Sequence, residues 1–196
     1  MKLEASYYQG NNVKSIAKDL LGKVLYSRIH NSITSGIIVE TEAYSYSEKG
    51  CHAYNYLRTN RTEVMFNTGG VAYVYLCYGI HHLFNIVTNK EDEPEAVLIR
   101  ALEPLAGQEM MMKRMKYNHI RKITSGPGKL TKALGIDRRL NGKLLTNNEI
   151  WLEDHGIKFA KCDIVSAKRV GIEYAGDDAK LPWRFYVKDN PWISRP

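Results

Sequence analysis

Short apolar runs separated by polar turns dominate this chain, and they constrain its fold more than any other feature. Apolar and β-branched runs predict strands over 24–29, 36–43, 71–78, 82–88, 96–99, 149–152, 164–170 and 184–187. Helical spacing and helix-start signals predict helices over 13–21, 104–115, with Pro104 as its first residue, and 129–134. Strands and helices do not alternate regularly, so the pattern favours an α+β domain with a mixed or antiparallel sheet.

The composition combines a basic surplus with an excess of tyrosine. The chain has 28 Lys and Arg against 21 Asp and Glu, which gives a net charge of +7. This surplus favours a polyanionic partner such as nucleic acid. The 13 tyrosines far outnumber the 4 phenylalanines and 3 tryptophans. Because tyrosine both stacks and hydrogen-bonds, this excess predicts a polar binding surface.

Several classes of protein are excluded by the sequence. The N-terminal residues form no apolar signal segment, and the longest apolar run, 71–80, is too short to span a bilayer. The three cysteines, Cys51, Cys77 and Cys162, contain no CxxC pair. An odd count without such a pair argues against a disulfide scaffold and a zinc ribbon. We therefore expect a soluble cytoplasmic protein that makes no membrane contact.

The first candidate site is a row of polar side chains along the predicted strand 36–43. Glu40, Glu42 and Tyr44 share one face because side chains alternate along a strand, and the apolar residues between them face the core. Two neighbouring carboxylates of this kind can activate a water molecule. From spacing alone, the alternative is a solvated strand face.

The second candidate site is a tyrosine-rich hairpin centred on Gly79. Tyr73 and Tyr75 share a strand face, and Tyr78 and Ile80 flank the glycine at the predicted tip. A large side chain exposed at such a tip is costly unless it meets a partner, and it can act as a wedge between stacked bases. The alternative is a cross-strand tyrosine ladder that only stabilises the hairpin.

The histidines do not predict a metal site. His81 and His82 are adjacent, so their rings point to opposite faces of a strand. His52 has no cysteine or histidine partner at a familiar metal spacing. We therefore expect no metal and no cofactor.

A glycine-rich segment precedes the predicted helix 129–134. Its residues, SGPGKL at 125–130, place backbone N–H groups and Lys129 where a phosphate could bind. The segment lacks the spacing of a P-loop, so a simple loop is the alternative.

Five motifs together resemble the alkyladenine (methylpurine) DNA glycosylase family. They are IIVETEAY at 37–44, YVYLCYGIHHLFNIVT at 73–88, VLIRALEP at 97–104, GPGKLTKALGI at 126–136, and RVGIEYAG with LPWRFYV between 169 and 187. Each motif alone is weak evidence, but all five occur in the order typical of the family. The resemblance covers about residues 20–192.

The resemblance implies a reaction and two catalytic residues. It implies an enzyme that flips a damaged purine out of the duplex and hydrolyses its N-glycosidic bond. Glu42 matches the carboxylate that activates the attacking water, and Arg100 matches the arginine beside them. No matched position is a lysine, so a monofunctional glycosylase that uses water is expected rather than a lyase.

The resemblance also implies a base pocket and a wedge. Tyr44, His52 and Tyr75 match the pocket walls, where tyrosine faces attract a cationic alkylated purine. Asn85 matches the asparagine that excludes guanine by crowding its exocyclic amine. The residues expected to contact DNA are Tyr78 as the wedge, Ile80 and Lys129, with Arg58, Arg61 and Lys132 as further candidates.

We therefore expect residues 1–196 to form a single α+β domain. It would contain a mixed or antiparallel curved sheet, surrounding helices and a protruding β-hairpin that acts as the DNA wedge. The expected partner of this monomer is double-stranded DNA containing 3-methyladenine, 7-methylguanine, hypoxanthine or ethenoadenine, in the cytoplasm or nucleoid.

Two alternatives remain open from the sequence. One is a non-catalytic module that binds nucleic acid through its basic, tyrosine-rich surface. Such a module would not need Glu42, because a carboxylate facing a polyanion weakens binding. The other is a metal-dependent hydrolase that uses Glu42 together with His52.

Overall fold

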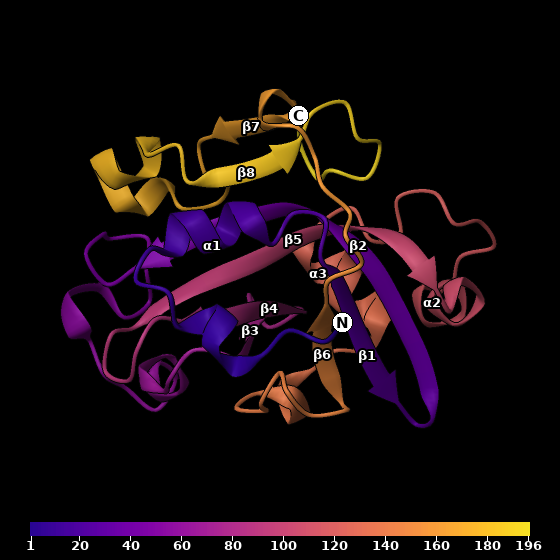
Figure 1. Ribbon diagram of the computed structural model, residues 1–196, viewed down its shortest axis with the longest axis horizontal. Helices are drawn as coiled ribbons and strands as arrows, with labels where there is room; N and C mark the ends of the chain where they lie inside the picture. Colours follow the sequence, from indigo (N-terminus) through magenta and orange to yellow (C-terminus); the bar gives the residue numbers. More distant parts are fainter.

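A single eight-stranded sheet organises the computed structural model, which describes all 196 residues (Figure 1). The strands are β1 (Val24–Ile29), β2 (Ser32–Ser45), β3 (Ala72–Cys77), β4 (His81–Thr88), β5 (Glu95–Ala106), β6 (Ile150–Glu153), β7 (Ile164–Ala167) and β8 (Arg184–Val187). The main order is β3-β4-β5-β2-β1-β6, while β8 pairs with β2 and β7. Every pair is antiparallel, which confirms the predicted α+β class.

The long strand β2 is central to the sheet. It pairs with β1 at its beginning and with β8 at Glu40–Glu42, while β5 runs along its other side. Its register with β5 shifts around Glu40, where the ladder is irregular. Glu40 and Glu42 therefore lie in a strand that has neighbours on both edges.

Three α-helices and several short 3₁₀ segments surround the sheet. The α-helices are α1 (Val13–Asp19), α2 (Gln108–Met115) and α3 (Pro127–Leu134). The 3₁₀ segments are η1 (Ala5–Gln9), η2 (Tyr54–Tyr56), η3 (Glu63–Phe66), η4 (Arg138–Leu140), η5 (Lys161–Asp163) and η6 (Glu173–Lys180). Asn12 caps α1 by accepting a hydrogen bond from the Ser15 backbone N–H at 3.1 Å. Gly135 ends α3 with a positive φ of 72°.

The prediction that Pro104 begins a helix is wrong. Pro104 lies within β5 and is paired with Gly36, next to a shift in register between β2 and β5. Proline is tolerated at such an irregular position because it has no N–H to contribute to the ladder. The helix begins instead at Gln108, directly after Gly107 with φ 73°.

The main core contains 29 buried residues and joins the sheet to all three α-helices. In β4, Phe84 and Ile86 belong to this core, whereas Asn85 between them projects to the opposite face. A separate cluster of eight buried residues, including Cys51, Met65 and Tyr73, lies under the β3–β4 hairpin. Burial of each large side chain stabilises the fold by about 1.5–3 kcal/mol.

The predicted hairpin around Gly79 is confirmed. Strands β3 and β4 are joined by Tyr78, Gly79 and Ile80, and the Ile80 N–H donates to the Cys77 carbonyl at 3.1 Å. Tyr78 and Gly79 both have positive φ, at 49° and 71°. A positive φ is costly for a tyrosine, so the turn holds Tyr78 in a strained, outward conformation.

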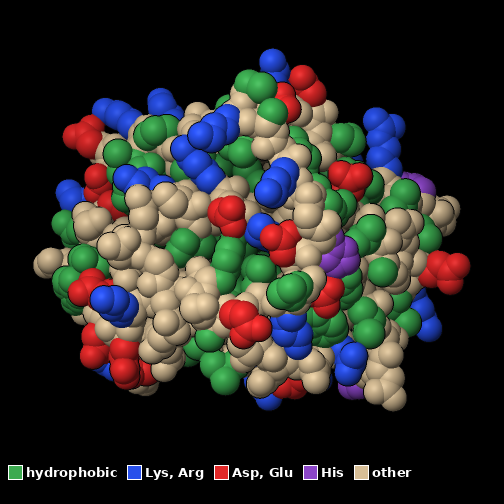
Figure 2. Space-filling view, viewed as in Figure 1, with side chains coloured by type: hydrophobic (Ala, Val, Ile, Leu, Met, Phe, Trp, Pro, Cys, Tyr) green, Lys and Arg blue, Asp and Glu red, His purple; other side chains and the backbone are tan.

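No α-helix of the structure is long and apolar enough to cross a membrane. On the face shown in Figure 2, basic and acidic side chains are interspersed. The net charge of +7 is therefore not gathered into one large basic area on that face.

Candidate active site

A cavity of about 810 Å³ opens beside the β3–β4 hairpin. Residues 125–129, residues 170–172 and Tyr174 form further parts of its wall. Its aromatic residues are Tyr44, Tyr73, Tyr75, Tyr78, Tyr174, His52 and His81. Arg61, Arg100 and Lys129 line it as well, and no Asp or Glu does. A cavity with cationic and aromatic walls fits an anionic ligand that carries a flat ring.

His52 is fixed in the wall by two polar contacts. Its Nδ1 lies 2.9 Å from the Tyr73 hydroxyl, and its Nε2 lies 3.2 Å from the Arg61 guanidinium. A guanidinium only donates, so Nε2 accepts and Nδ1 carries the proton that it donates to Tyr73. Burial and then the Arg61 charge lower the pKa of His52 to about 4. The imidazole is therefore neutral at pH 7.

Three other predicted pocket residues lie on the same wall. Tyr75 meets the His52 ring edge-on, with ring centroids 4.8 Å apart. Asn85 donates its Nδ2 to the Tyr73 carbonyl at 3.2 Å, which fixes the amide at the cavity surface. Tyr44 lines the cavity as well. The structure thus brings together all four residues predicted for the base pocket.

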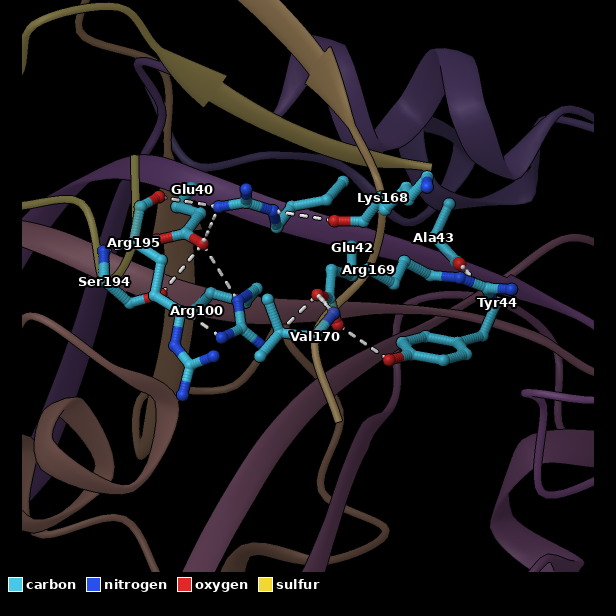
Figure 3. A network of polar contacts seen from close by, with 11 residues as sticks. Glu40, Glu42, Ala43, Tyr44, Arg100, Lys168, Arg169, Val170, Ser194 and Arg195 are labelled. Carbon is cyan, nitrogen blue, oxygen red and sulfur yellow. Dashed lines mark hydrogen bonds and ion pairs between the residues drawn. The ribbon is translucent and has the colours of Figure 1, made fainter. Parts of the chain in front are cut away.

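Glu42 lies directly behind this wall and is completely buried. Its Oε2 accepts a hydrogen bond from the Tyr44 hydroxyl at 2.6 Å, and its Oε1 accepts one from the Val170 backbone N–H at 2.8 Å. Arg100 adds an ion pair to Oε1 at 3.2 Å (Figure 3). Tyr44, Arg100 and Val170 all line the cavity, whereas Glu42 itself does not. Each residue in contact with the carboxylate therefore lines the cavity, and the carboxylate lies directly behind them.

Glu40 has a different environment on the same strand. It is completely buried and its two oxygens have four polar contacts, from the Arg100 Nε, the Arg184 guanidinium, and the Ser194 hydroxyl and N–H. Three of these contacts reach Oε1 and one reaches Oε2. Arg100 is the only one of the Glu40 partners that lines the cavity, whereas all three partners of Glu42 line it. The alternative of a solvated strand face is wrong for both residues.

Arg100 connects the two carboxylates. Its side chain is 6% exposed and donates from Nε to Glu40 at 2.9 Å. Burial alone lowers the pKa of Arg100, but the charges of Glu42 and Glu40 outweigh this effect and raise it. The guanidinium is thus a permanent positive charge at the cavity wall.

The tip of the hairpin is exposed beside the cavity. Tyr78 is 88% exposed and Ile80 is 72% exposed. Tyr78 lines the edge of the cavity, and the exposed Tyr174 lines it from another segment. A purely structural tyrosine ladder does not explain Tyr78, because its ring contributes almost no buried surface.

The segment 125–129 adjoins the hairpin. Gly128 packs so closely that a Cβ atom there would lie 2.7 Å from the His81 ring. Only glycine permits this approach, which places Lys129 on the cavity wall. Lys129 and Tyr78 therefore line the same cavity.

The two arginines of the irregular segment 46–71 differ. Arg58 forms ion pairs with Glu63 at 2.8 Å and Asp92 at 3.0 Å, so its charge is compensated. Arg61 forms no ion pair, lies over the Tyr75 ring at 4.7 Å and lines the cavity. Of this pair, Arg61 alone presents an uncompensated charge to a polyanion.

The arrangement required by the metal-dependent alternative is absent. His52 contacts Tyr73 and Arg61, whereas Glu42 contacts Tyr44, Val170 and Arg100. No group of three His, Cys, Asp or Glu side chains converges anywhere in the structure.

The sequence did not reveal what supports Tyr44. Arg169 stacks on the Tyr44 ring at 4.7 Å and forms a buried pair with Glu48, with contacts of 2.6 and 2.7 Å. Arg169 also donates to the Ala43 carbonyl at 2.9 Å. Glu48 and Arg169 lie 121 residues apart, so no local pattern links them.

Comparison with known proteins assigns this fold and cavity to a family. The family model for methylpurine-DNA glycosylase matches residues 6–191. A protein of Natranaerobius thermophilus is 48% identical over 99% of both chains, and one of Alkaliphilus oremlandii is 44% identical over the full length of both. A protein of Desulfitobacterium hafniense is 43% identical over 91% of this chain and 92% of its own. Each of the three is named "Putative 3-methyladenine DNA glycosylase".

These matches cover every segment that lines the cavity and define the class of protein as a DNA glycosylase, a DNA-binding hydrolase of DNA repair. More narrowly, the chain belongs to the methylpurine-DNA glycosylase family. DNA is therefore its substrate.

Proposed function

We propose that this protein is a monofunctional glycosylase that removes alkylated or deaminated purines, including 3-methyladenine, from duplex DNA. The observation that carries the proposal is the position of Glu42 behind the cavity wall, where its three partners, Tyr44, Arg100 and Val170, all line the cavity. The relatives named for 3-methyladenine support the choice of lesion.

In the proposed reaction the damaged purine leaves the helix and enters the cavity, where Tyr44, Tyr75 and His52 surround it. Extrusion is necessary because the glycosidic bond is inaccessible in stacked duplex, and a damaged base is easier to extrude. Tyr78 fills the gap in the helix, with Ile80 and Lys129 beside it. Asn85 excludes guanine by crowding its exocyclic amine.

The chemical step is hydrolysis by water. Glu42 accepts a proton from a water molecule whose oxygen attacks the sugar C1′ atom. The N-glycosidic bond breaks and its electron pair leaves with the purine. The transition state has oxocarbenium character, so the Glu42 carboxylate also stabilises the developing positive charge on the sugar. A cationic alkylated purine leaves without a proton donor, which suits a cavity that has no acidic side chain.

The test is the variant Glu42→Gln, with Glu149→Gln at an exposed carboxylate of a surface ion pair as its control. Duplexes containing one alkylated purine or one hypoxanthine are incubated with each protein, and released bases are separated by chromatography. Glu42→Gln is expected to release no base but to bind abasic-like DNA as well as wild type or better, because it lacks a charge that repels phosphates. Retained turnover would remove Glu42 as the base.

The same experiment addresses the non-catalytic alternative. A nucleic-acid-binding module would release no base as wild type, and Glu42→Gln would change only its affinity. Base release by the wild-type protein and by Glu149→Gln therefore separates the two functions.

A further inference from the structure

The carboxylate of Glu40 is held by residues from three distant parts of the chain. It accepts from the Arg100 Nε at 2.9 Å and from the Arg184 guanidinium at 3.1 Å. It also accepts from the backbone N–H of Ser194 at 2.6 Å and from the Ser194 hydroxyl at 2.9 Å. Of these groups, only Arg100 also contacts Glu42 (Figure 3).

Ser194 brings the segment that follows β8 into this network. Besides its two contacts with Glu40, its hydroxyl lies 3.2 Å from an Arg100 nitrogen, Nη2. The next residue, Arg195, accepts a hydrogen bond from Arg184 through its carbonyl at 2.7 Å. This segment therefore contacts Glu40 and gives Arg100 a second anchor.

Three nitrogens of one rigid group make these contacts. The Arg100 Nε meets Glu40, its Nη2 meets Ser194 and its Nη1 meets Glu42. A guanidinium is planar with its donors in a fixed fork. When two of the nitrogens are held, the direction of the third is determined.

The buried charges around Glu40 and Glu42 compensate one another. Two carboxylates, Glu40 and Glu42, face two guanidiniums, Arg100 and Arg184, and all four side chains are at most 6% exposed. Glu40 would otherwise be a buried uncompensated anion, which is strongly unfavourable. Because Arg184 shares Glu40, the charge of Arg100 remains available to Glu42.

We propose that Glu40 and Ser194 are positioning residues that aim the Arg100 guanidinium at Glu42, so that the segment after β8 controls the rate of the chemical step. The proposal rests on the function proposed above, in which Glu42 activates water. Neither residue touches substrate, and neither lines the cavity.

Single-turnover excision of one alkylated purine tests this role. Glu40→Gln is expected to slow excision by up to about 100-fold, because a displacement of about 1 Å at a reacting centre has an effect of this size. Ser194→Ala, which keeps the backbone contact, is expected to slow it less. Glu149→Gln and Ser166→Ala, at exposed positions outside the network, are the matched controls and should excise at the wild-type rate.

Affinity for abasic-like DNA separates positioning from general damage. Glu40→Gln and Ser194→Ala are expected to bind it as wild type does, since the cavity wall is unchanged. Should Glu40→Gln fail to fold, Ser194→Ala carries the test alone, because it removes only one hydroxyl. Parallel losses of affinity and rate in Ser194→Ala would overturn the proposal.

A double-mutant cycle shows whether Glu40 acts through Arg100. In an Arg100→Gln background, Glu40→Gln should add less than about a threefold further loss, because there is no guanidinium left to aim. An equal further loss in both backgrounds would contradict the proposal. Full activity of Glu42→Gln with none in Glu40→Gln would also contradict it, and would make Glu40 the base.

A spectroscopic measurement needs no activity and so distinguishes failure of this proposal from failure of the proposed function. The Arg100 Nε–H should give an NMR signal, assigned with Arg100→Lys, that exchanges slowly in the wild type. Faster exchange in Ser194→Ala, but not in Ser166→Ala, would support the contact even in a protein that released no base. An unchanged exchange rate of the Arg100 Nε–H in Ser194→Ala would overturn the proposed positioning role.

Discussion

The hydroxyl of Tyr44 donates a 2.6 Å hydrogen bond to the carboxylate of Glu42. Burial, and then the Glu42 charge, raise the pKa of Tyr44 well above its ordinary value, so the hydroxyl keeps its proton. One residue thus presents a flat ring to the cavity and donates to the proposed base at the same time. A purine stacked on Tyr44 would be held in register with the carboxylate.

Loss of the exposed ring at the hairpin tip should slow excision. Stacking of a base on an aromatic side chain is worth about 1–3 kcal/mol, so Tyr78→Ser is expected to slow single-turnover excision from paired duplex about 5- to 150-fold. A lesion opposite a gap leaves the helix more easily, so the substitution should slow its excision less. Single-turnover rates of one lesion in both contexts check this.

The control for Tyr78→Ser is Tyr117→Ser, an exposed tyrosine that does not line the cavity. It should retain the wild-type rate in both contexts. Equal losses for Tyr78→Ser in the two contexts would mean that the ring acts on chemistry or folding instead of on base extrusion.

The cations of the cavity wall should account for part of the salt dependence of binding. Each phosphate that a cation neutralises contributes a slope of about −0.9 to log K against log salt. Lys129→Ala and Arg61→Ala should each reduce the slope for undamaged duplex by about one such unit. Lys180→Ala, whose charge already pairs with Asp177, should leave it unchanged. Binding isotherms at several salt concentrations measure the slopes.

The buried pair that supports Tyr44 should be important for stability. Glu48→Ala leaves Arg169 buried and without its carboxylate, and breaking such a pair costs about 3–5 kcal/mol. Asp177→Ala removes a fully exposed partner and should not change the midpoint of unfolding measurably. Urea denaturation followed by circular dichroism compares the two, and similar stability of both variants would refute the prediction.

The neutral His52 should make stability depend on pH. Its pKa is lowered to about 4 in the folded protein, against about 6.5 in an unfolded chain. Between these values the unfolded state binds more protons, so stability falls as pH falls from 7 toward 4. At pH 5 the loss attributable to His52 should be about 2 kcal/mol. Wild type should therefore lose more stability than His52→Gln between pH 7 and pH 5. Parallel curves of unfolding free energy against pH for the two proteins would contradict this prediction.

The local features of the fold could be read from the sequence. The β3–β4 hairpin, strand β8 and the end of α3 at Gly135 were all predicted, because each depends on neighbouring residues. The local rule about proline fails at Pro104 because it cannot reveal that β5 continues to Ala106 alongside β2. Glu40 and Glu42 both contact Arg100, and Tyr44 donates to Glu42, so the three side chains lie together. The alternation itself does not hold along the whole of β2, because the register shifts around Glu40.

What the sequence determined by itself was the set of reactive side chains and the elements that carry them. Only the tertiary structure decided how Glu40 differs from Glu42, since their partners lie at Arg100, Val170 and Ser194. Periodicity within a strand reports which face a side chain takes, but not which distant charges meet it there. The place of Glu42 behind the cavity wall follows from its contacts with Arg100 and Val170, which lie 58 and 128 positions away.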